Sequence, residues 1–266
     1  EMDVDREEGR EVKGHLAEAR ADLQRAEALL PGDPAILELK LRATTTWVMH
    51  QSNRGQLQEA EVREAIALAR ARLAQGPSAE VLRILRNLWE ILALGAFRRG
   101  EDPDPLLEQA RQAIGQARAL DPADPVLAFR QGLLEARQVA LDASRGRAPW
   151  TAFERGLRAM EEAARSAPGS LRIPGTMAEL WMERAEFERL HGLDPRPSCR
   201  EARRALAEPL AREPRFYRWQ GTLGSAWMIE GQHQLALGQE ARPALESALE
   251  AFRREAALKP DLAEPL

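Results

Sequence analysis

This 266-residue chain has little cysteine, few aromatic residues and no long apolar run, and each shortage excludes a class of protein. Because Cys199 is its single cysteine, the sequence has neither an internal disulfide framework nor a multi-cysteine metal site. No apolar run approaches the roughly 20 residues that a membrane-spanning helix needs. The first eight residues, EMDVDREE, are acidic where a signal peptide is basic. We therefore expect no membrane segment and a cytoplasmic location.

An excess of charge of one sign is also lacking. The chain has 38 Lys and Arg against 42 Asp and Glu, and the two signs are interspersed. This balance provides no strong field for a polyanion, so we expect no nucleic-acid partner. Strand signals are absent as well, because β-branched and aromatic residues never alternate with polar ones over a useful length. The fold is therefore expected to consist of helices.

What the sequence does contain is an internal repeat of about 46 residues. A proline, a glycine and a small residue recur together, at successive intervals of 46, 45, 46, 46 and 46 residues. The markers are Pro31, Pro77, Pro122, Pro168, Pro214 and Pro260; Gly9, Gly55, Gly100, Gly146, Gly192 and Gly238; and Ala19, Ala65, Ala110, Gly156, Ala202 and Ala248. Five near-equal intervals in three separate markers indicate a repeat architecture.

Each unit is predicted to form two helices, which we call helix A and helix B. Between the proline and the glycine lie about 22 residues with an apolar spacing near 3.6, which is typical of one long helix. The glycine can take the left-handed conformation that ends helix A, and the prolines just after it suit the first turn of helix B. Helix B then runs for about 15 residues and stops at the next proline.

The recurring small residue indicates where helix B lies close to helix A, since a larger side chain would push the two apart. One helix pair cannot bury its apolar face alone, so the pairs must stack on one another. We therefore expect an all-α fold, a single solenoid of antiparallel helix pairs over residues 1–266. Its units are a partial repeat 1–30, the repeats 31–76, 77–121, 122–167, 168–213 and 214–259, and the start of a further repeat at 260–266.

The residue order inside a unit resembles the tetratricopeptide motif (TPR). Leu223, Gly224 and Trp227 follow the motif's helix A, and Ala248, Phe252 and Pro260 follow its helix B. The matching aromatic position of helix A carries Trp89, Trp181 and Trp227, while Glu135 replaces the aromatic residue in one unit. The unit is also longer than the motif's usual length of about 34 residues. The resemblance implies a TPR-like α-solenoid whose concave surface binds a protein or peptide.

A narrower resemblance concerns the turns RGEDPDP and HGLDPRP and the helices after them. They resemble repeat arrays that follow the catalytic domain in many bacterial Ser/Thr protein kinases. This implies an alternative function, as the regulatory or substrate-recruiting region of such a kinase. The chain has no Gly-rich phosphate loop and no VAIK, HRD or DFG motif, so the catalytic domain would lie outside it. Because both ends fall inside a repeat, we expect the chain to be part of a longer array.

The resemblance also places candidate partner-binding residues on helix A. The family's groove positions fall on Arg83 and Asn87, Leu133 and Arg137, Glu179 and Glu183, and Ser225 and Ile229. The first pair resembles half of the basic and Asn clamp that some members use on a C-terminal carboxylate. A full clamp is not expected, because Thr45, Glu179 and Ser225 fill the equivalent Asn place in other units. The alternative interpretation is that each is an ordinary solvated helix residue.

The segment REPRFYRW, residues 212–219, is a second candidate. Arg215, Tyr217, Arg218 and Trp219 combine charge and aromatic surface, as binding hot spots do. In the alternative interpretation, the aromatic residues anchor the start of helix A and the arginines are solvated.

Catalytic patterns are scarce. The four histidines form no i, i+4 pair and no HExxH motif, so we expect no zinc site. Cys199 stands at the predicted start of a helix B, where a thiol pKa can fall, but no base is fixed nearby in the sequence. An enzyme with catalytic groups in the groove is thus the weakest alternative. We expect a scaffold with no catalytic residue, cofactor or metal, whose partner and oligomeric state the sequence leaves open.

Overall fold

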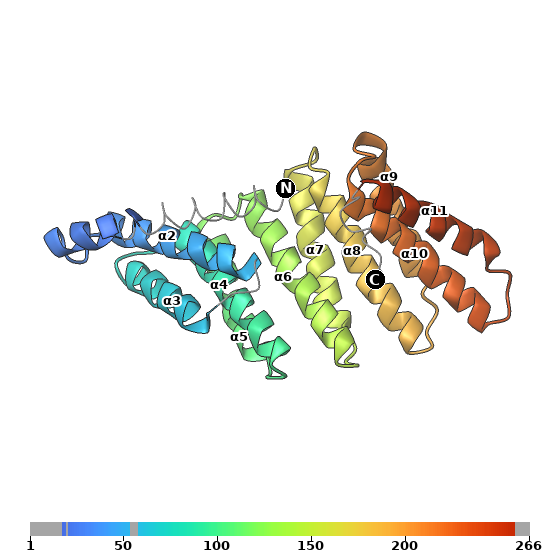
Figure 1. Cartoon of the computed structure of the whole chain (residues 1–266), viewed down its shortest axis with the longest axis horizontal. Helices are drawn as coiled ribbons and strands as arrows, with labels where there is room; N and C mark the ends of the chain where they lie inside the picture. Colours follow the sequence, from blue (N-terminus) through green and yellow to red (C-terminus); the bar gives the residue numbers. More distant parts are fainter. Residues whose placement is uncertain (1–17, 20, 54–57, 259–266) are drawn as a thin grey trace. The chain divides into compact units, whose positions relative to one another are not determined.

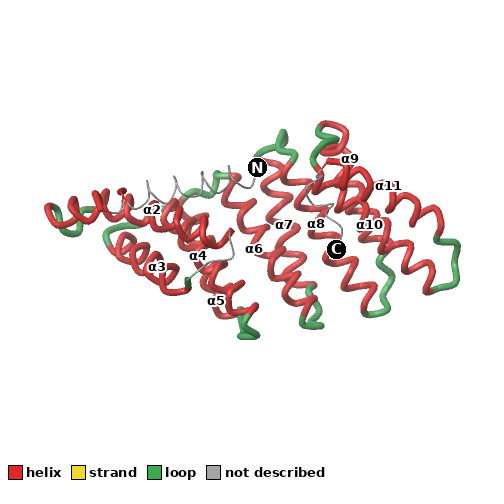
Figure 2. The backbone as a smooth tube through the Cα atoms, in the orientation of Figure 1, coloured by secondary structure: helices red, strands yellow, loops and turns green. Residues whose placement is uncertain are grey.

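The computed structural model describes residues 18–19, 21–53 and 58–258, and every regular element in these ranges is an α-helix (Figure 1). Short loops join the helices, and no strand occurs among the described residues (Figure 2). The expected all-α fold of stacked helix pairs is confirmed. Glycine 9, glycine 55 and the predicted unit 260–266 lie outside the described residues.

Long and slightly shorter helices alternate along the chain, as the helix A and helix B pattern predicts. The helices in the A position are α2 (Pro34–Asn53), α4 (Ala79–Arg98), α6 (Pro125–Ser144), α8 (Arg172–Leu190) and α10 (Tyr217–Ala236). Those in the B position are α3 (Glu59–Ala74), α5 (Asp104–Leu120), α7 (Trp150–Ser166), α9 (Arg196–Arg212) and α11 (Arg242–Leu258).

The helices group into two compact units, which divide between Pro122 and Ala123. This division falls one residue after the boundary expected between the repeats 77–121 and 122–167. In the first unit α2 packs on α3, α4 packs on α5, and α4 also contacts α2 and α3. In the second unit the pairs are α6 with α7, α8 with α9, and α10 with α11. Within that unit α8 contacts both α6 and α10, so its three A helices form one layer.

The glycine after helix A has the backbone geometry that ends a helix. Gly100, Gly146, Gly192 and Gly238 have φ values of 75°, 66°, 71° and 66°, in the left-handed region that side chains disfavour. After α4, the N–H of Gly100 donates to Phe97 O at 2.9 Å and the N–H of Glu101 donates to Ala96 O at 2.9 Å. This pair of hydrogen bonds is the Schellman closure of a helix. It turns the chain back, so that helix B packs against helix A.

The one 45-residue interval has a local origin. Helix α4 begins at Ala79, two residues after Pro77, whereas α6 begins at Pro125, three residues after Pro122. The turn before α4 is therefore one residue shorter than the turn before α6. There Ser78 caps α4, because its hydroxyl accepts a hydrogen bond from Val81 N at 3.3 Å.

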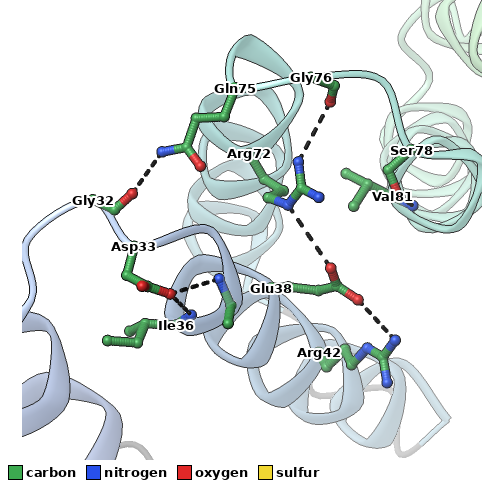
Figure 3. A network of polar contacts seen from close by, with 11 residues as sticks. Gly32, Asp33, Ile36, Glu38, Arg42, Arg72, Gln75, Gly76, Ser78 and Val81 are labelled. Atoms are coloured by element: carbon green, nitrogen blue, oxygen red, sulfur yellow. Dashed lines mark hydrogen bonds and ion pairs between the residues drawn. The ribbon is translucent and has the colours of Figure 1, made fainter.

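In the first unit, polar contacts join the turn before α2 to the turn after α3 (Figure 3). Gln75 Nε2 donates to Gly32 O at 2.7 Å, and Arg72 Nη1 donates to Gly76 O at 3.4 Å. Arg72 also forms an ion pair with Glu38 of α2 at 3.8 Å. Turns that are one repeat apart thus lie side by side, as stacking requires.

The recurring small residue of helix B lies in the packed interface. Ala65, Ala110 and Ala202 are fully buried. In the unit that has glycine instead, a Cβ atom at Gly156 would stand 3.2 Å from both Glu135 Cβ and Leu180 Cδ2. The Glu135 side chain, where other units have an aromatic residue, is fully buried and pairs with Arg155 at 2.8 Å.

Candidate functional site

Three helices of the second unit, α8, α10 and α11, line an open hollow of about 570 Å³, which we call the acidic hollow. Its acidic residues are Glu179, Glu183 and Glu186 on α8 and Glu255 on α11. On each helix the lining residues share one face. Glu179, Glu183 and Glu186 follow one another at intervals of four and three residues, as do Arg218, Thr222 and Ser225 on α10.

The floor of the acidic hollow is apolar. Met182 of α8, Met228 and Ile229 of α10 and Phe252 of α11 line it, and Ile229 is only 3% exposed. The wall also includes the backbone of Gly221, where a Cβ atom would stand 2.5 Å from Glu255 Oε1. The Glu255 carboxylate therefore lies directly over the backbone of α10. The hollow combines apolar surface with charged groups at fixed places, as ligand sites do.

Only part of the negative charge is paired inside the hollow. Arg189 binds Glu186 at 2.6 Å, and Arg218 stands 3.6 Å from Glu179. Within the described part of the chain, Glu183 and Glu255 form no hydrogen bond or ion pair. Two carboxylates of the lining thus have no cationic partner in contact among the residues that the structure describes.

Burial raises the pKa of the Glu179 carboxyl and that of the Glu183 carboxyl. The field of Arg218 opposes the increase in the pKa of Glu179, and Arg137 on α6 opposes it for Glu183. In both cases the loss of solvation exceeds the favourable field. These carboxylates are therefore held in an environment that disfavours their charge.

A second hollow of about 610 Å³ adjoins the first, because Glu179 and Arg218 line both. It lies among α6, α8 and α10, and Leu133 is its contribution from α6. Its charged lining consists of Arg172, Arg212 and Arg218 against Glu179 and Glu213. We call it the arginine-rich hollow.

Several residues that the sequence predicted as partner-binding come together in the second unit. Glu179, Glu183 and Arg218 line the acidic hollow, as do Ser225 and Ile229 from the same pattern. Arg137 is close enough to lower the pKa of Glu183 and is itself exposed. The structure thus places side chains from α6, α8 and α10 around one region.

The first candidate pair lies in the other unit. Arg83, on α4, forms an ion pair with Glu80 one turn earlier. The side-chain oxygen of Asn87 accepts a hydrogen bond from Arg86 Nη1 at 2.5 Å. Both side chains therefore already have partners within α4.

The segment 212–219 has a largely structural arrangement. Trp219 is 5% exposed and belongs to a core cluster with Ala178, Ala202 and Leu206. The rings of Phe216 and Tyr217 stack with centroids 6.2 Å apart, and Arg215 is exposed and lines neither hollow. Trp219 thus anchors the start of α10, while Arg212, Phe216, Arg218 and Trp219 also line the arginine-rich hollow and Arg218 reaches both hollows.

Other lining residues were not identified from the sequence. Glu186 and Thr222 could have been found by extending the face of Glu183 and Arg218 by one helical turn. Glu255 could not, because it lies on a helix B and reaches the hollow only through the packing of α11 on α10. No periodic signal in the sequence connects it to α8.

Cys199 and His191, two reactive groups considered from the sequence, line neither hollow, although Cys199 packs in a core cluster with Ile229 of the apolar floor. Cys199 is fully buried, and burial raises the pKa of its thiol to about 12. His191 stacks on Phe187 with ring centroids 3.8 Å apart. Among the described residues, no group of three His, Cys, Asp or Glu side chains is placed to hold a metal ion. None of the described helices is long and apolar enough to cross a membrane.

Comparison with known proteins shows the fold. No family model and no curated protein matches the chain. Among solved structures, it is similar to a tetratricopeptide repeat protein from Parabacteroides merdae, with 14% identity, a TM-score of 0.54, and coverage of 96% of this chain and 89% of that one. It is also similar to MamA, with 13% identity, a TM-score of 0.50, and coverage of 84% and 97%. The chain therefore has an all-α, TPR-like solenoid fold of stacked helix pairs.

Proposed function

We propose that this chain is a scaffold that binds a protein or peptide, and that the acidic hollow of the second unit is where a partner segment binds. The observation that supports this is a hollow of about 570 Å³ with an apolar floor and charged walls, left open by the side chains of three helices. Its size lies within the range of about 300–1,000 Å³ that is usual for ligand pockets. Helical repeats commonly present such surfaces to extended segments of other proteins.

The lining explains how such a segment would be held. Met182, Met228 and Phe252 offer apolar surface, each buried methylene of a partner contributing about 0.8 kcal/mol. Thr222 and Ser225 of α10 stand among them with hydroxyl groups. Apolar contact would provide affinity, and the charged and hydroxyl groups would set the position of the segment.

We also propose that binding, without catalysis, is the activity of this chain. Cys199, the thiol considered from the sequence and set aside there, lines neither hollow and is held as a thiol by burial. Carboxylates are the titratable groups that the acidic hollow does contain, alongside two arginines. Their arrangement is suited to charge recognition.

The alternative of a kinase region depends on the amino-acid sequences of the turns. The fold is compatible with this alternative but does not favour it. A scaffold in a kinase and a free-standing adaptor would use the same hollow in the same way. The reading frame upstream of residue 1 in the source genome separates the two, because a kinase domain there would carry the Gly-rich loop, the strand lysine and the HRD and DFG motifs.

The proposed binding site is tested by filling it. A library of randomised 12-residue peptides displayed on phage is selected against the chain, and the enriched peptides are measured against Ser225→Trp, which places an indole in the hollow. Thr151→Trp is the matched control, since Thr151 is exposed on α7 and lines neither hollow. We expect Ser225→Trp to lose binding by at least about tenfold, or 1.4 kcal/mol, while Thr151→Trp retains it. Equal binding by both variants would place the site elsewhere.

A further inference from the structure

The charges that line the acidic hollow do not balance. Four carboxylates, those of Glu179, Glu183, Glu186 and Glu255, face two guanidinium groups, those of Arg189 and Arg218. Arg189 is engaged with Glu186 at 2.6 Å, and Arg218 is 3.6 Å from Glu179. The two remaining carboxylates are Glu183 and Glu255.

Glu183 has lost much of its contact with water without gaining a contact partner. Burial raises the pKa of its carboxyl, and the neighbouring charges of Glu179 and Glu186 add to the increase. Arg137 lowers this pKa from a distance but forms no ion pair with Glu183 within 4.0 Å. A carboxylate in this position gains most from a cation that arrives with a ligand, because that cation replaces the missing solvation.

Glu255 lines the same hollow from α11. Helix α10 contacts both α8 and α11, so Glu183 on α8 and Glu255 on α11 flank it. Between them lie Gly221, whose missing side chain leaves room for the Glu255 carboxylate, and the small hydroxyl residues Thr222 and Ser225. The acidic hollow therefore presents two carboxylates that belong to two different helices.

The apolar residues next to these carboxylates suit the rest of a long cationic side chain. Met228, Ile229 and Phe252 line the same hollow as Glu183 and Glu255. Arginine and lysine carry an apolar stem below the charged head, and the stem packs well on such surface. The planar guanidinium of arginine can also bond to carboxylates through several N–H groups at once.

We propose that the acidic hollow recognises an extended peptide segment by an arginine or lysine side chain, whose charge is attracted to Glu183 and Glu255 and whose stem packs on the apolar floor. This inference rests on the proposed function and specifies its partner chemistry. The arginine-rich hollow beside it, with Arg172 and Arg212, would disfavour basic residues further along the segment. The partner is thus a segment with a localised basic position next to apolar residues.

The test uses the peptides selected from the randomised 12-residue library with the intact chain. The relevant peptides are those that compete with one another for the chain and lose binding to Ser225→Trp. We expect these peptides to share an arginine or lysine at one position. Replacing this residue by glutamine in a synthetic peptide should weaken binding about tenfold. Glu183→Gln and Glu255→Gln should each reduce that tenfold difference. Glu250→Gln, an exposed change on α11 away from the hollow, should preserve it.

The possible failures are distinguishable. If selection enriches no peptide whose binding depends on Ser225, the proposed function itself is wrong. If it enriches such peptides without a basic position, or if the glutamine variants bind the basic and neutral peptides as the unsubstituted chain does, only the cationic recognition is wrong. Circular dichroism of each variant checks its fold. If a variant fails to fold, the test instead uses the unsubstituted chain and a peptide whose basic residue is replaced by glutamate. An affinity equal to that of the basic peptide would overturn the inference.

Discussion

The indole of Trp219 lies against the backbone of Gly175, so closely that a Cβ atom at position 175 would stand 2.3 Å from Trp219 Nε1. Trp219 comes from the start of α10, and Gly175 comes from the first turns of α8. Phe216 extends this contact, because its ring centroid is 4.4 Å from that of Trp219. The aromatic segment therefore anchors α10 on α8, the two helices whose side chains line both hollows.

This contact predicts a steric effect at position 175. Gly175→Ala should destabilise the protein by about 1–3 kcal/mol, because the rigid indole of Trp219 must move to make room for the methyl group. Gly115→Ala is the contrasting change, since nothing lies within 4 Å of a Cβ at this helical position in α5. It should stabilise by up to about 1 kcal/mol, the helix propensity of alanine over glycine. Urea unfolding followed by circular dichroism measures both, and equal effects would contradict the close contact.

The buried Glu135 carboxylate predicts a dependence on Arg155. Arg155→Met should lower the free energy of unfolding by about 1–3 kcal/mol, because it removes the guanidinium that bonds to the fully buried Glu135 at 2.8 Å. The double variant Arg155→Met with Glu135→Leu should recover part of this loss, since no buried charge then remains at the site. Thermal unfolding of the two variants checks the order. A double variant less stable than the single one would show that the pair matters more for packing than for charge.

The raised pKa of Glu183 predicts that replacing this carboxylate by a neutral side chain increases the stability of the fold, by an amount that depends on pH. Because the folded-state pKa lies above the unfolded value, the folded chain binds the proton more tightly and loses stability as pH rises through that pKa. Glu183→Gln should therefore unfold at a higher urea concentration than the unsubstituted chain at pH 7. Below about pH 3, where the carboxyl is protonated in both states, the difference should vanish. The exposed change Glu250→Gln should stay within about 0.5 kcal/mol at both pH values, and a loss of stability in Glu183→Gln at pH 7 would contradict the argument.

The buried thiol predicts slow alkylation. Cys199 is fully buried and its pKa is about 12, so almost no thiolate, the nucleophilic form, exists in the folded chain at pH 8. Iodoacetamide should leave the native protein unmodified and should modify it once after unfolding in guanidinium chloride. Mass spectrometry counts the adducts. Equal rates in the folded and unfolded chains would show that the thiol is accessible.

Much of the fold could be predicted because its signals are local. A glycine at the end of each helix A is needed for the left-handed turn, which Gly100 and Gly192 adopt with φ values of 75° and 71°. Prolines at the start of helix B and apolar spacing near 3.6 act over a few residues as well. The shorter turn before α4 was visible in the sequence as one 45-residue interval. The structure shows that the turn from Pro77 to Ala79 is the segment that is one residue shorter.

The candidate site could be predicted only in part. Glu179 and Glu183 of α8 were found because they stand one repeat of 46 residues after Leu133 and Arg137 of α6, so the repeat itself carries the information. Tyr217 and Trp219 could not be judged from the sequence, because an aromatic residue beside arginines is equally suited to a binding surface and to a core. Packing over Gly175 decides that Trp219 is 5% exposed. The pairing of Arg83 with Glu80 likewise depends on side-chain geometry.

The sequence by itself determined the helices, their order, their ends and the pairing of A with B, because each of these depends on residues a few positions apart and on a repeated pattern. The tertiary structure alone decided how the lining of the acidic hollow is composed. Glu183 and Glu255 are 72 residues apart in the chain and meet the same space only because α8 and α11 both pack on α10. Which charges remain unpaired there depends on the angles and distances between packed helices, and no local rule of sequence specifies those.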